Sequence, residues 1–448
     1  MKRLPIDEII PRLLETIARS SSVVIQAPPG AGKTTRIPLA VLNAPFLGTQ
    51  RIVMLEPRRL AAANAARWMA ASLGEDVGRT VGYTIRFDRK VSPETRIEVV
   101  TEGVLTRRLQ SDPLLDGVGM VIFDEFHERS LNADTALALC LDVQQGLRED
   151  LKLVVMSATL DGGPVARLLG DAPVITSEGK SFPVDTIYLP QPAEGDCAEN
   201  VAGAVQRAVD ETSGDILAFL PGGGEIRRCQ KLLEGESRSQ HLLIAPLYGD
   251  LPFADQERAI TPADRRKVVL ATNIAETSLT IEGVAVVIDS GWSRQLRYDP
   301  ATGLNRLVTV RLSAASAAQR AGRAGRLGPG VCYRLWTQHI HLGLVPFTPP
   351  EILTSDLASL ALDLALWGVA DAAALRWLDL PPMPALTEGR HLLVKLGALD
   401  AGGRITAHGK AMAVLPLHPR LAHMLLTARD RGFGSLACDL AALLGERD

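Results

Sequence analysis

The chain has 448 residues, of which 46% are hydrophobic and 22% charged, and its formal net charge is −3. This length predicts two to four domains, and the composition is that of an ordinary globular protein. The slightly acidic balance gives no global sign of nucleic-acid binding, so a polyanion site would have to be a local groove. The N-terminal segment lacks the apolar core of a signal peptide, and the apolar runs are too short to span a membrane.

Short β-branched segments alternate with helix-like segments through the first third of the chain. The candidate strands are Val23–Ala27, Arg51–Leu55, Arg96–Val100, Gly119–Asp124 and Leu153–Ser157. Each is continuously apolar and bounded by turn or polar residues, which is typical of a parallel strand covered on both faces. Helical spacing is found between them, for example over Leu60–Leu73 and Asn132–Leu147. The alternation predicts a doubly wound parallel sheet.

A glycine-rich turn follows the first of these strands. Its residues Gly30, Ala31, Gly32, Lys33, Thr34 and Thr35 match the second half of the phosphate-loop pattern GxxxxGK[ST], although Ala27 replaces the first glycine. The glycines let successive backbone N–H groups face a phosphate. Lys33 can reach the β- and γ-phosphates, and the Thr34 hydroxyl can bind Mg²⁺. We therefore predict an ATP site, with a simple Gly/Pro turn as the alternative.

Two adjacent acids, Asp124 and Glu125, follow another candidate strand. Ligands of open α/β sheets bind at the carboxyl ends of such strands. Asp124 can hold Mg²⁺ together with Thr34, and Glu125 can bind the metal and polarise the attacking water as a general base. Charges that stabilise a helix N-terminus are the alternative interpretation. The phosphate loop on the same sheet favours the catalytic one.

A second series of strands begins after a linker that contains Ser181–Pro183 and Pro190–Asp196. The candidates are Ile216–Leu220, Leu242–Ala245, Lys267–Ala271 and Val284–Ile288, which predict a second α/β lobe. Alternating residues on both sides of an Asp-Pro…Gly turn predict a hairpin over Trp292–Val310. From about residue 350 the pattern becomes helical, as in Ile352–Leu366 and Leu386–Leu396.

An arginine-rich run, residues 319–326, carries the third chemical signal. Gln319, Arg323 and Arg326 have the spacing i, i+4, i+7, which predicts one face of a helix. A glutamine can orient water, and two arginines can neutralise γ-phosphate charge as fingers. Gly322 and Gly325 each cost a helix about 1 kcal/mol, which argues against the alternative of a merely solvated basic face.

These motifs together resemble the DEAH-box (DEAH/RHA) branch of superfamily 2 helicases, and the resemblance covers nearly the whole chain. Its strongest residues are 124–127, where Phe126 replaces the family's usual alanine, 272–281 and 319–326. It implies two tandem RecA-like doubly wound parallel-sheet lobes, then a winged-helix domain and the start of a helical bundle. The implied boundaries are residues 1–175, 176–345, 346–400 and 401–448, and we expect the bundle to be cut short.

The resemblance also implies roles for individual side chains. His127, Ser157 and Thr159 would couple hydrolysis to motion, although a Ser-Ala-Thr tripeptide by itself reads as a simple turn. Glu282 would lie near the ribose. The implied RNA contacts are Arg58, Arg86, Thr101, Thr272, Asn273 and the hairpin tip Asp299–Gly303.

Two departures from the family pattern affect these expectations. Residues 221–225 lack the Gln-Glu pair of the family's fourth motif, which puts that motif's contacts in doubt. Trp68 stands where the family has an arginine on the nucleotide base. Tryptophan can also stack, which predicts weak base selectivity, whereas a core position is the alternative.

The resemblance implies an ATP- and Mg²⁺-dependent enzyme that moves 3′-to-5′ on a single strand and unwinds duplexes. We expect RNA rather than DNA as the strand, although the motifs themselves leave that choice open. Five cysteines without a CxxC pair fit a reducing cytoplasm and argue against a zinc site. We expect a monomer. Two other functions stay open: an NTPase that does not need nucleic acid, and a nucleotide-gated RNA clamp that never unwinds.

Overall fold

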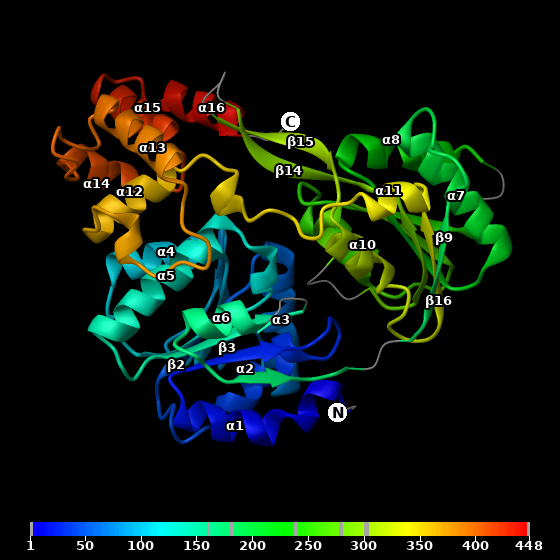
Figure 1. Cartoon of the computed structure of the whole chain (residues 1–448), viewed down its shortest axis with the longest axis horizontal. Helices are drawn as coiled ribbons and strands as arrows, with labels where there is room; N and C mark the ends of the chain where they lie inside the picture. Colours follow the sequence, from blue (N-terminus) through cyan, green and yellow to red (C-terminus); the bar gives the residue numbers. More distant parts are fainter. Residues whose placement is uncertain are drawn as a thin grey trace.

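A computed structural model describes residues 3–158, 162–179, 182–236, 241–276, 281–299 and 304–445. Figure 1 shows two α/β lobes side by side, with a helical module above the first of them. The first lobe contains an eight-stranded sheet in the order β4-β3-β5-β2-β6-β7-β1-β8, parallel except for the β3–β4 pair. Its strands are β1 (Ser22–Gln26), β2 (Arg51–Leu55), β3 (Val81–Ile85), β4 (Asp88–Lys90), β5 (Ile97–Val100), β6 (Val118–Phe123), β7 (Lys152–Ser157) and β8 (Val174–Thr176).

Both faces of this sheet are covered by helices, which confirms the predicted doubly wound arrangement. Successive residues of a strand point to opposite faces, and in β1 the side chains of Val23 and Val24 belong to two different apolar cores. This explains why the strands read as continuous apolar runs. The helices are α1 (Ile10–Arg19), α2 (Lys33–Val41), α3 (Arg59–Ser72), α4 (Glu102–Ser111), α5 (Leu131–Gly146) and α6 (Gly162–Leu168), with short 3₁₀ turns η1 (Pro5–Glu8) and η2 (Phe126–Glu128).

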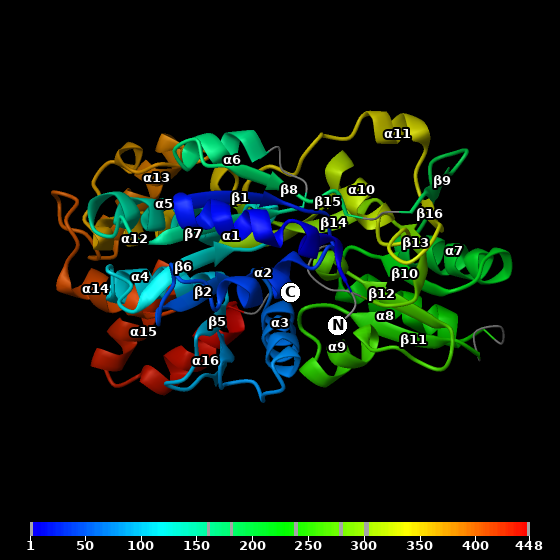
Figure 2. The ribbon, with the colours of Figure 1, turned by 90° about the horizontal axis from the view of Figure 1, so that it is seen from below.

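The second lobe contains a parallel six-stranded sheet in the order β11-β12-β10-β13-β16-β9. Its strands are β9 (Val184–Tyr188), β10 (Asp215–Phe219), β11 (Leu243–Leu247), β12 (Lys267–Ala271), β13 (Val284–Asp289) and β16 (Gly330–Arg334). Its helices are α7 (Cys197–Glu211), α8 (Gly223–Glu234), α9 (Phe253–Ile260), α10 (Ala314–Ala321) and α11 (Gln338–Leu342), with a 3₁₀ turn η4 (Asn273–Ala275). Viewed from below, α3 and α9 lie where the lobes meet (Figure 2), and Arg67 of α3 pairs with Glu257 of α9.

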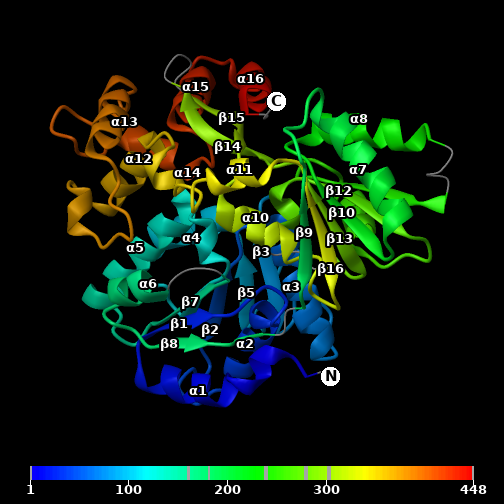
Figure 3. The same cartoon turned by 45° about the vertical axis from the view of Figure 1, so that its right-hand side comes forward.

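The predicted hairpin is confirmed as β14 (Trp292–Asp299) paired with β15 (Leu304–Arg311). Its tip, residues 300–303, lies outside the described residues. The hairpin leaves the second lobe and reaches the helical module (Figure 3). There the backbone N–H of Tyr298 donates to the carbonyl of Thr354 at 3.4 Å.

The helical module packs on the first lobe through one continuous apolar core. Leu360 and Leu386 of the module belong to the same buried cluster as Leu137 and Leu141 of α5. No helix in the described part of the chain has the length and apolarity needed to cross a membrane. The elements are η5 (Glu351–Leu353), α12 (Ala358–Trp367), η6 (Ala372–Ala374), α13 (Met383–Lys395), α14 (Ala407–Val414), α15 (Pro419–Asp430) and α16 (Gly434–Gly445).

A buried acid at this junction makes the stability of the chain depend on pH. The amide of Gln110 on α4 donates to Asp363 on α12 at 2.6 Å, and burial raises the pKa of Asp363 to about 6. The protonated Asp363 stabilises the folded chain. This stabilisation is fully present below about pH 3.9, the pKa of Asp363 in the unfolded chain, and is lost as the pH rises through about 6. Asp363→Asn keeps a side-chain oxygen that can accept from Gln110 but carries no negative charge at pH 8. It should therefore raise the unfolding temperature at pH 8 by roughly 1–3 °C.

Thermal unfolding at pH 5 and pH 8 checks this expectation. The gain from Asp363→Asn should be larger at pH 8 than at pH 5. Asp142→Asn is the matched control, because Asp142 is exposed and accepts from the Trp367 indole at the same junction. An equal change at both pH values for Asp363→Asn would contradict the role given to its burial.

Candidate functional site

The phosphate loop lies between β1 and α2, and α2 begins at Lys33. Gly30 and Gly32 have φ values of 82° and 94°, in the left-handed region that favours glycine. A Cβ added to Gly32 would lie 2.6 Å from Leu4 Cδ1, so a side chain there would have to displace Leu4 as well as adopt a strained backbone. Ala27 occupies the place of the first glycine and is buried, with its N–H donating to the carbonyl of Ser157 at 3.0 Å.

Side chains from the loop and from the acidic pair meet at the carboxyl edge of the first sheet. The Lys33 ammonium donates to Glu125 Oε1 at 2.9 Å, and both side chains are almost fully buried. Next to this ion pair, the Thr34 hydroxyl donates to Asp124 Oδ2 at 2.5 Å. The structure thus brings together the four residues that the sequence predicts for phosphate, metal and water.

Burial and neighbouring charges decide the protonation of this cluster. Burial alone would lower the pKa of Lys33, but the carboxylates of Glu125 and Asp124 outweigh it and raise the pKa. Burial would raise the pKa of Glu125, but Lys33 and His127 hold that pKa well below its usual range. Burial raises the pKa of Asp124, and Lys33 opposes this. Glu125 is therefore ionised, as a general base must be.

The backbone at Glu125 is strained. Its φ of 48° and ψ of 34° place a non-glycine residue in the left-handed region. Such residues cost roughly 1–3 kcal/mol and gather at functional sites, where the surrounding structure holds them. Here the ion pair with Lys33 and the 3₁₀ turn that follows Glu125 hold the carboxylate toward the phosphate loop.

The donors in this cluster fit a magnesium ion. Mg²⁺ is usually bound by one or two carboxylates together with substrate phosphates and water, rather than by a complete protein cage. Thr34 and Asp124 supply a hydroxyl and a carboxylate within hydrogen-bonding distance of each other. Within the described ranges, no cluster of three or more His, Cys, Asp or Glu side chains forms a site for a metal ion.

His127 connects the acidic segment to the end of β7. Its Nδ1 accepts from the backbone N–H of Ala158 at 3.4 Å and lies 3.3 Å from Glu125 Oε2. Burial lowers the pKa of His127, so the ring is neutral. Ser157 is buried at the end of β7, whereas Thr159 lies outside the described residues. The role of these residues in coupling stays a prediction.

The arginine-rich run is not one helix face, so that part of the prediction is wrong. Helix α10 ends at Ala321, and Arg323 and Arg326 lie in the turns that follow it. Glycine explains the early end, because Gly322 stands at the C-cap and Gly325 packs against another chain segment. A Cβ added to Gly325 would lie 2.6 Å from the carbonyl of Phe182.

One of the two predicted fingers, Arg326, nevertheless reaches the phosphate loop of the other lobe, and the charge of Arg323 helps to lower the pKa of Glu125. A Cβ added to Gly30 would lie 3.9 Å from Arg326 Nε. Burial lowers the pKa of Arg326 to about 10, and burial together with the nearby Arg326 lowers the pKa of Arg323. Arg323 is buried and Arg326 is half-buried. Two mutually repelling guanidinium groups, one of them beside a phosphate loop, form a site that an anion would stabilise. Gln319 lies partly buried on α10.

Arg58 is half-buried and pairs with an acid of the first lobe. Its guanidinium donates to both oxygens of Glu128 at 3.2 and 3.1 Å, in the two-pronged geometry of a strong arginine–carboxylate pair. Arg58 thereby ties the start of α3 to the acidic segment. Its predicted contact with RNA stays a prediction.

Arg86 lines an open groove with a volume of about 430 Å³. Its guanidinium lies 4.7 Å from the centre of the Phe87 ring, which is 88% exposed. Arg107 and Arg108 of α4 and Pro416 of the helical module line the same groove. Of the other predicted RNA contacts, Thr101 is the N-cap residue of α4, Thr272 comes just before η4 and Asn273 begins it.

Trp68 is 41% exposed, so the alternative that it is a core residue is wrong. The Arg36 guanidinium of α2 lies 5.5 Å from the centre of its ring system. Glu282 is exposed just before β13. The contacts of Trp68 with a base and of Glu282 with a ribose stay predictions.

Sequence reasoning missed several buried charged residues around this site. Glu56 is fully buried at the end of β2, and burial raises its pKa well above the usual range. Among the residues that the structure describes, its two carboxylate oxygens have no hydrogen-bond partner. Arg320 is also fully buried and pairs with two acids, Glu276 and Asp289. The only signal for Arg320 was its place inside the arginine-rich run.

Comparison with protein families divides the chain in the same way as the two sheets. The family model for DEAD/DEAH box helicases matches residues 7–168, and that for the helicase conserved C-terminal domain matches residues 202–328. The winged-helix model of the helicase associated domain (HA2) matches residues 390–417.

One curated relative, the ATP-dependent RNA helicase HrpB of Escherichia coli (strain K12), is 51% identical over all 448 residues. The chain spans about half of that relative, 55% of its length. A crystal structure of E. coli DEAH/RHA helicase HrpB matches 99% of the chain, and 57% of that protein, with a TM-score of 0.93. A structure of the E. coli DExH-box NTPase HrpB matches all of the chain, and 55% of that protein, with a TM-score of 0.88. The chain therefore belongs to the DEAH-box helicase family.

Proposed function

We propose that the chain hydrolyses ATP between its two lobes and uses the resulting motion to unwind RNA. The observation that carries this proposal is the approach of Arg326 from the second lobe to Gly30 of the phosphate loop. A nucleotide on that loop would therefore touch both lobes. Thr34 and Asp124 would hold Mg²⁺, which would neutralise charge on the phosphates.

The chemistry follows from the buried ion pair. Lys33 would exchange Glu125 for the β- and γ-phosphates, which leaves Glu125 ionised and available as the base. Water would attack the γ-phosphorus and lose its proton to Glu125 as the bond to the β-phosphate oxygen breaks, giving ADP and phosphate. Arg323 and Arg326 would stabilise the charge that develops on the transferred group, and Gln319 would orient the water.

Closing and opening of the lobes would drive movement along one strand. The groove beside Arg86 offers three arginines and an exposed aromatic ring, the chemistry that grips single strands through phosphates and stacked bases. Such a grip is tolerant of sequence and sensitive to salt. We propose movement in the 3′-to-5′ sense, RNA rather than DNA as the substrate, a monomer as the working unit and the cytoplasm as the compartment.

Two alternative functions would give different results in assays of ATP turnover and strand displacement. An NTPase that does not need nucleic acid would keep the same rate when RNA is added. A nucleotide-gated clamp would bind and hydrolyse but would not displace a strand. Two lobes in one chain, with both fingers in cis, argue against a ring-forming assembly ATPase.

The test measures ATP turnover with poly-U, with DNA of equal length and without nucleic acid, at fixed salt. We expect stimulation that is stronger with RNA. Strand displacement is then followed on RNA duplexes with a 3′ or a 5′ overhang, and we expect ATP-dependent release only from the 3′ substrate. An ATP turnover rate that neither poly-U nor DNA changes would refute the proposal that the chain is a nucleic-acid motor.

A further inference from the structure

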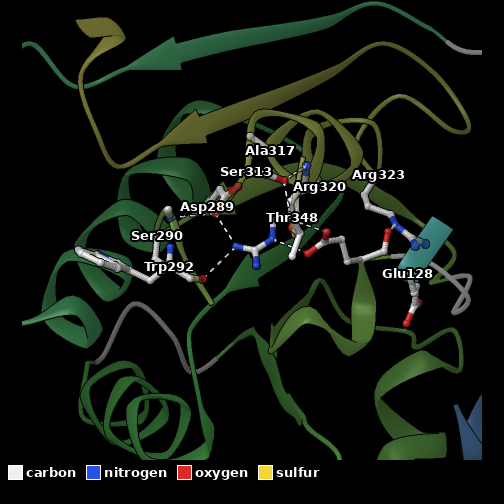
Figure 4. A network of polar contacts seen from close by, with 12 residues as sticks. Glu128, Asp289, Ser290, Trp292, Ser313, Ala317, Arg320, Arg323 and Thr348 are labelled. Atoms are coloured by element: carbon white, nitrogen blue, oxygen red, sulfur yellow. Dashed lines mark hydrogen bonds and ion pairs between the residues drawn. The ribbon is translucent and has the colours of Figure 1, made fainter. Parts of the chain in front are cut away.

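A fully buried arginine, Arg320, connects three segments of the second lobe without touching the phosphate loop. Its Nε donates to Glu276 Oε2 at 3.0 Å, and its Nη1 donates to Asp289 Oδ1 at 2.8 Å. Nη1 also donates to the carbonyl of Trp292 at 3.2 Å, and the guanidinium lies 4.7 Å from the centre of the Phe219 ring. In Figure 4, Asp289 and Trp292 lie on one side of Arg320 and Arg323 lies on the other.

Glu276 is the part of this network that reaches a finger. Its carboxylate accepts from Arg320 and from the Ser316 hydroxyl of α10. Its backbone carbonyl accepts from Arg323 Nε at 3.0 Å. The position of Arg323 therefore depends on the backbone of Glu276, and the side chain of Glu276 fixes that backbone to α10.

The same short segment leads to predicted RNA contacts. Glu276 directly follows η4, which begins at Asn273, and Thr272 precedes that turn. A shift of this turn would move the Glu276 carbonyl, and with it Arg323, because only two residues separate Asn273 from Glu276. A nucleic-acid strand bound at Thr272 and Asn273 would thus act on the hydrolytic site through the backbone between Asn273 and Glu276. The last link is the hydrogen bond from Arg323 to the Glu276 carbonyl.

A second branch of the network reaches the hairpin. Asp289 Oδ1 accepts from the backbone N–H of Gly291 at 2.9 Å, and β14 begins at the next residue, Trp292. At its far end this hairpin contacts the helical module through Tyr298 and Thr354. Arg320 therefore holds the base of the hairpin and the segment that carries Glu276 in one fixed arrangement.

Stability alone does not explain such a group. Removing an arginine and two acids from water costs several kcal/mol per ion, and apolar replacements of buried ion pairs are often equally stable. Arginine is, however, the side chain whose planar fork can hold two carboxylates and a carbonyl in fixed directions. The network therefore fits a role in which Arg320 holds Glu276, Asp289 and the Trp292 carbonyl in fixed relative positions.

We propose that Arg320 and Glu276 are positioning residues that convey nucleic-acid binding at Thr272 and Asn273 to the finger Arg323. The inference rests on the proposed function and deepens it. Arg320 aligns Glu276, and the Glu276 carbonyl aligns Arg323, so both residues would act on the nucleotide through the finger.

Glu276→Ala tests this directly, because it frees the segment while Arg320 keeps its pair with Asp289. The ratio of RNA-stimulated to basal kcat should fall about 10- to 100-fold, the effect of a misplaced catalytic group. The KM for ATP should change about twofold or less, because ground-state binding is untouched. Arg320→Lys should likewise lower this ratio with little change in the KM for ATP. The lysine ammonium keeps the positive charge but lacks the planar guanidinium that holds several acceptors at once. Glu211→Ala, which removes an exposed partner of Arg207 in the same lobe, should leave the ratio unchanged.

A second readout separates positioning from folding. RNA should strengthen the binding of ADP with aluminium fluoride, a mimic of the transferred phosphoryl group, in the unsubstituted chain but not in Glu276→Ala. The affinity for ADP alone should be equal in both. Full RNA stimulation of Glu276→Ala, or a parallel loss of basal and stimulated rates with a lower unfolding temperature, would overturn the inference. Absence of stimulation in the unsubstituted chain would instead overturn the proposed function.

Discussion

Replacing Lys33 with alanine is expected to lower ATP turnover at least about 100-fold, the effect of removing a group that stabilises charge in the transition state. Lys33 is the cation closest to the predicted base, and its ammonium lies 2.9 Å from Glu125. Without it, the phosphate loop loses the cation that would hold the β- and γ-phosphates beside Glu125 and the bound metal. Steady-state phosphate release with saturating RNA measures the loss. Near-normal turnover of a folded Lys33→Ala chain would refute the phosphate-loop interpretation.

The same substitution also affects stability, so the fold has to be controlled. Removing one partner of a buried ion pair leaves an uncompensated charge that costs about 3–5 kcal/mol. The double variant Lys33→Met with Glu125→Gln removes both charges and should regain much of the unfolding temperature without regaining turnover. Lys152→Met is the matched control, because Lys152 is also partly buried and donates to the carbonyl of Ser20 away from the site. It should retain turnover.

Arg326→Ala is expected to lower kcat by about 10³-fold or more, with a change in the KM for ATP of only a few fold. A finger acts on charge that develops in the transition state, so its loss spares ground-state binding. Arg326 is well placed for this effect, because it enters the cleft from the second lobe beside Gly30. Single-turnover measurements with saturating ATP isolate the chemical step.

Arg228 provides the control for this experiment. It is an exposed arginine of the same lobe that pairs with Asp196 and Glu199. Arg228→Ala removes the same charge from the lobe and should leave kcat unchanged. If Arg326→Ala kept its kcat, or lost ATP affinity in proportion to turnover, Arg326 would have no finger role.

The sequence was sufficient for the parts of the site that depend on a single lobe. Lys33, Thr34, Asp124 and Glu125 all follow strands that are buried on both faces, and such strands read as continuous apolar runs. Parallel strands bring their carboxyl ends to one edge, so residues about 90 positions apart could be expected to meet. The structure shows them in direct contact.

Elements outside this regular pattern were less predictable. The edge strand β9, residues 184–188, is mostly exposed, so it lacks the apolar run that revealed its neighbours. In β3 the residues Gly82 and Thr84 interrupt the pattern. The end of α10 was placed too late, because spacing alone does not show that Gly325 must lie against the carbonyl of Phe182.

Contacts between distant segments could not be predicted from local patterns. The resemblance implied an RNA contact for Arg58, but its pairing with Glu128 depends on how α3 and the acidic segment pack together. Arg320 and Glu276 lie 44 positions apart, and their ion pair depends on the approach of α10 to η4. A charged residue within a basic run gives no sequence signal that it is fully buried.

The proposed motor requires that Lys33 and Arg326 act on the same nucleotide. A structure of the chain with Mg²⁺, ADP, aluminium fluoride and single-stranded RNA tests it most directly. We predict that the Lys33 ammonium and the Arg326 guanidinium both contact the fluoride group, with Thr34 and Asp124 on the metal. A closed complex in which Arg326 stays away from the nucleotide, or in which the nucleotide binds one lobe alone, would contradict it.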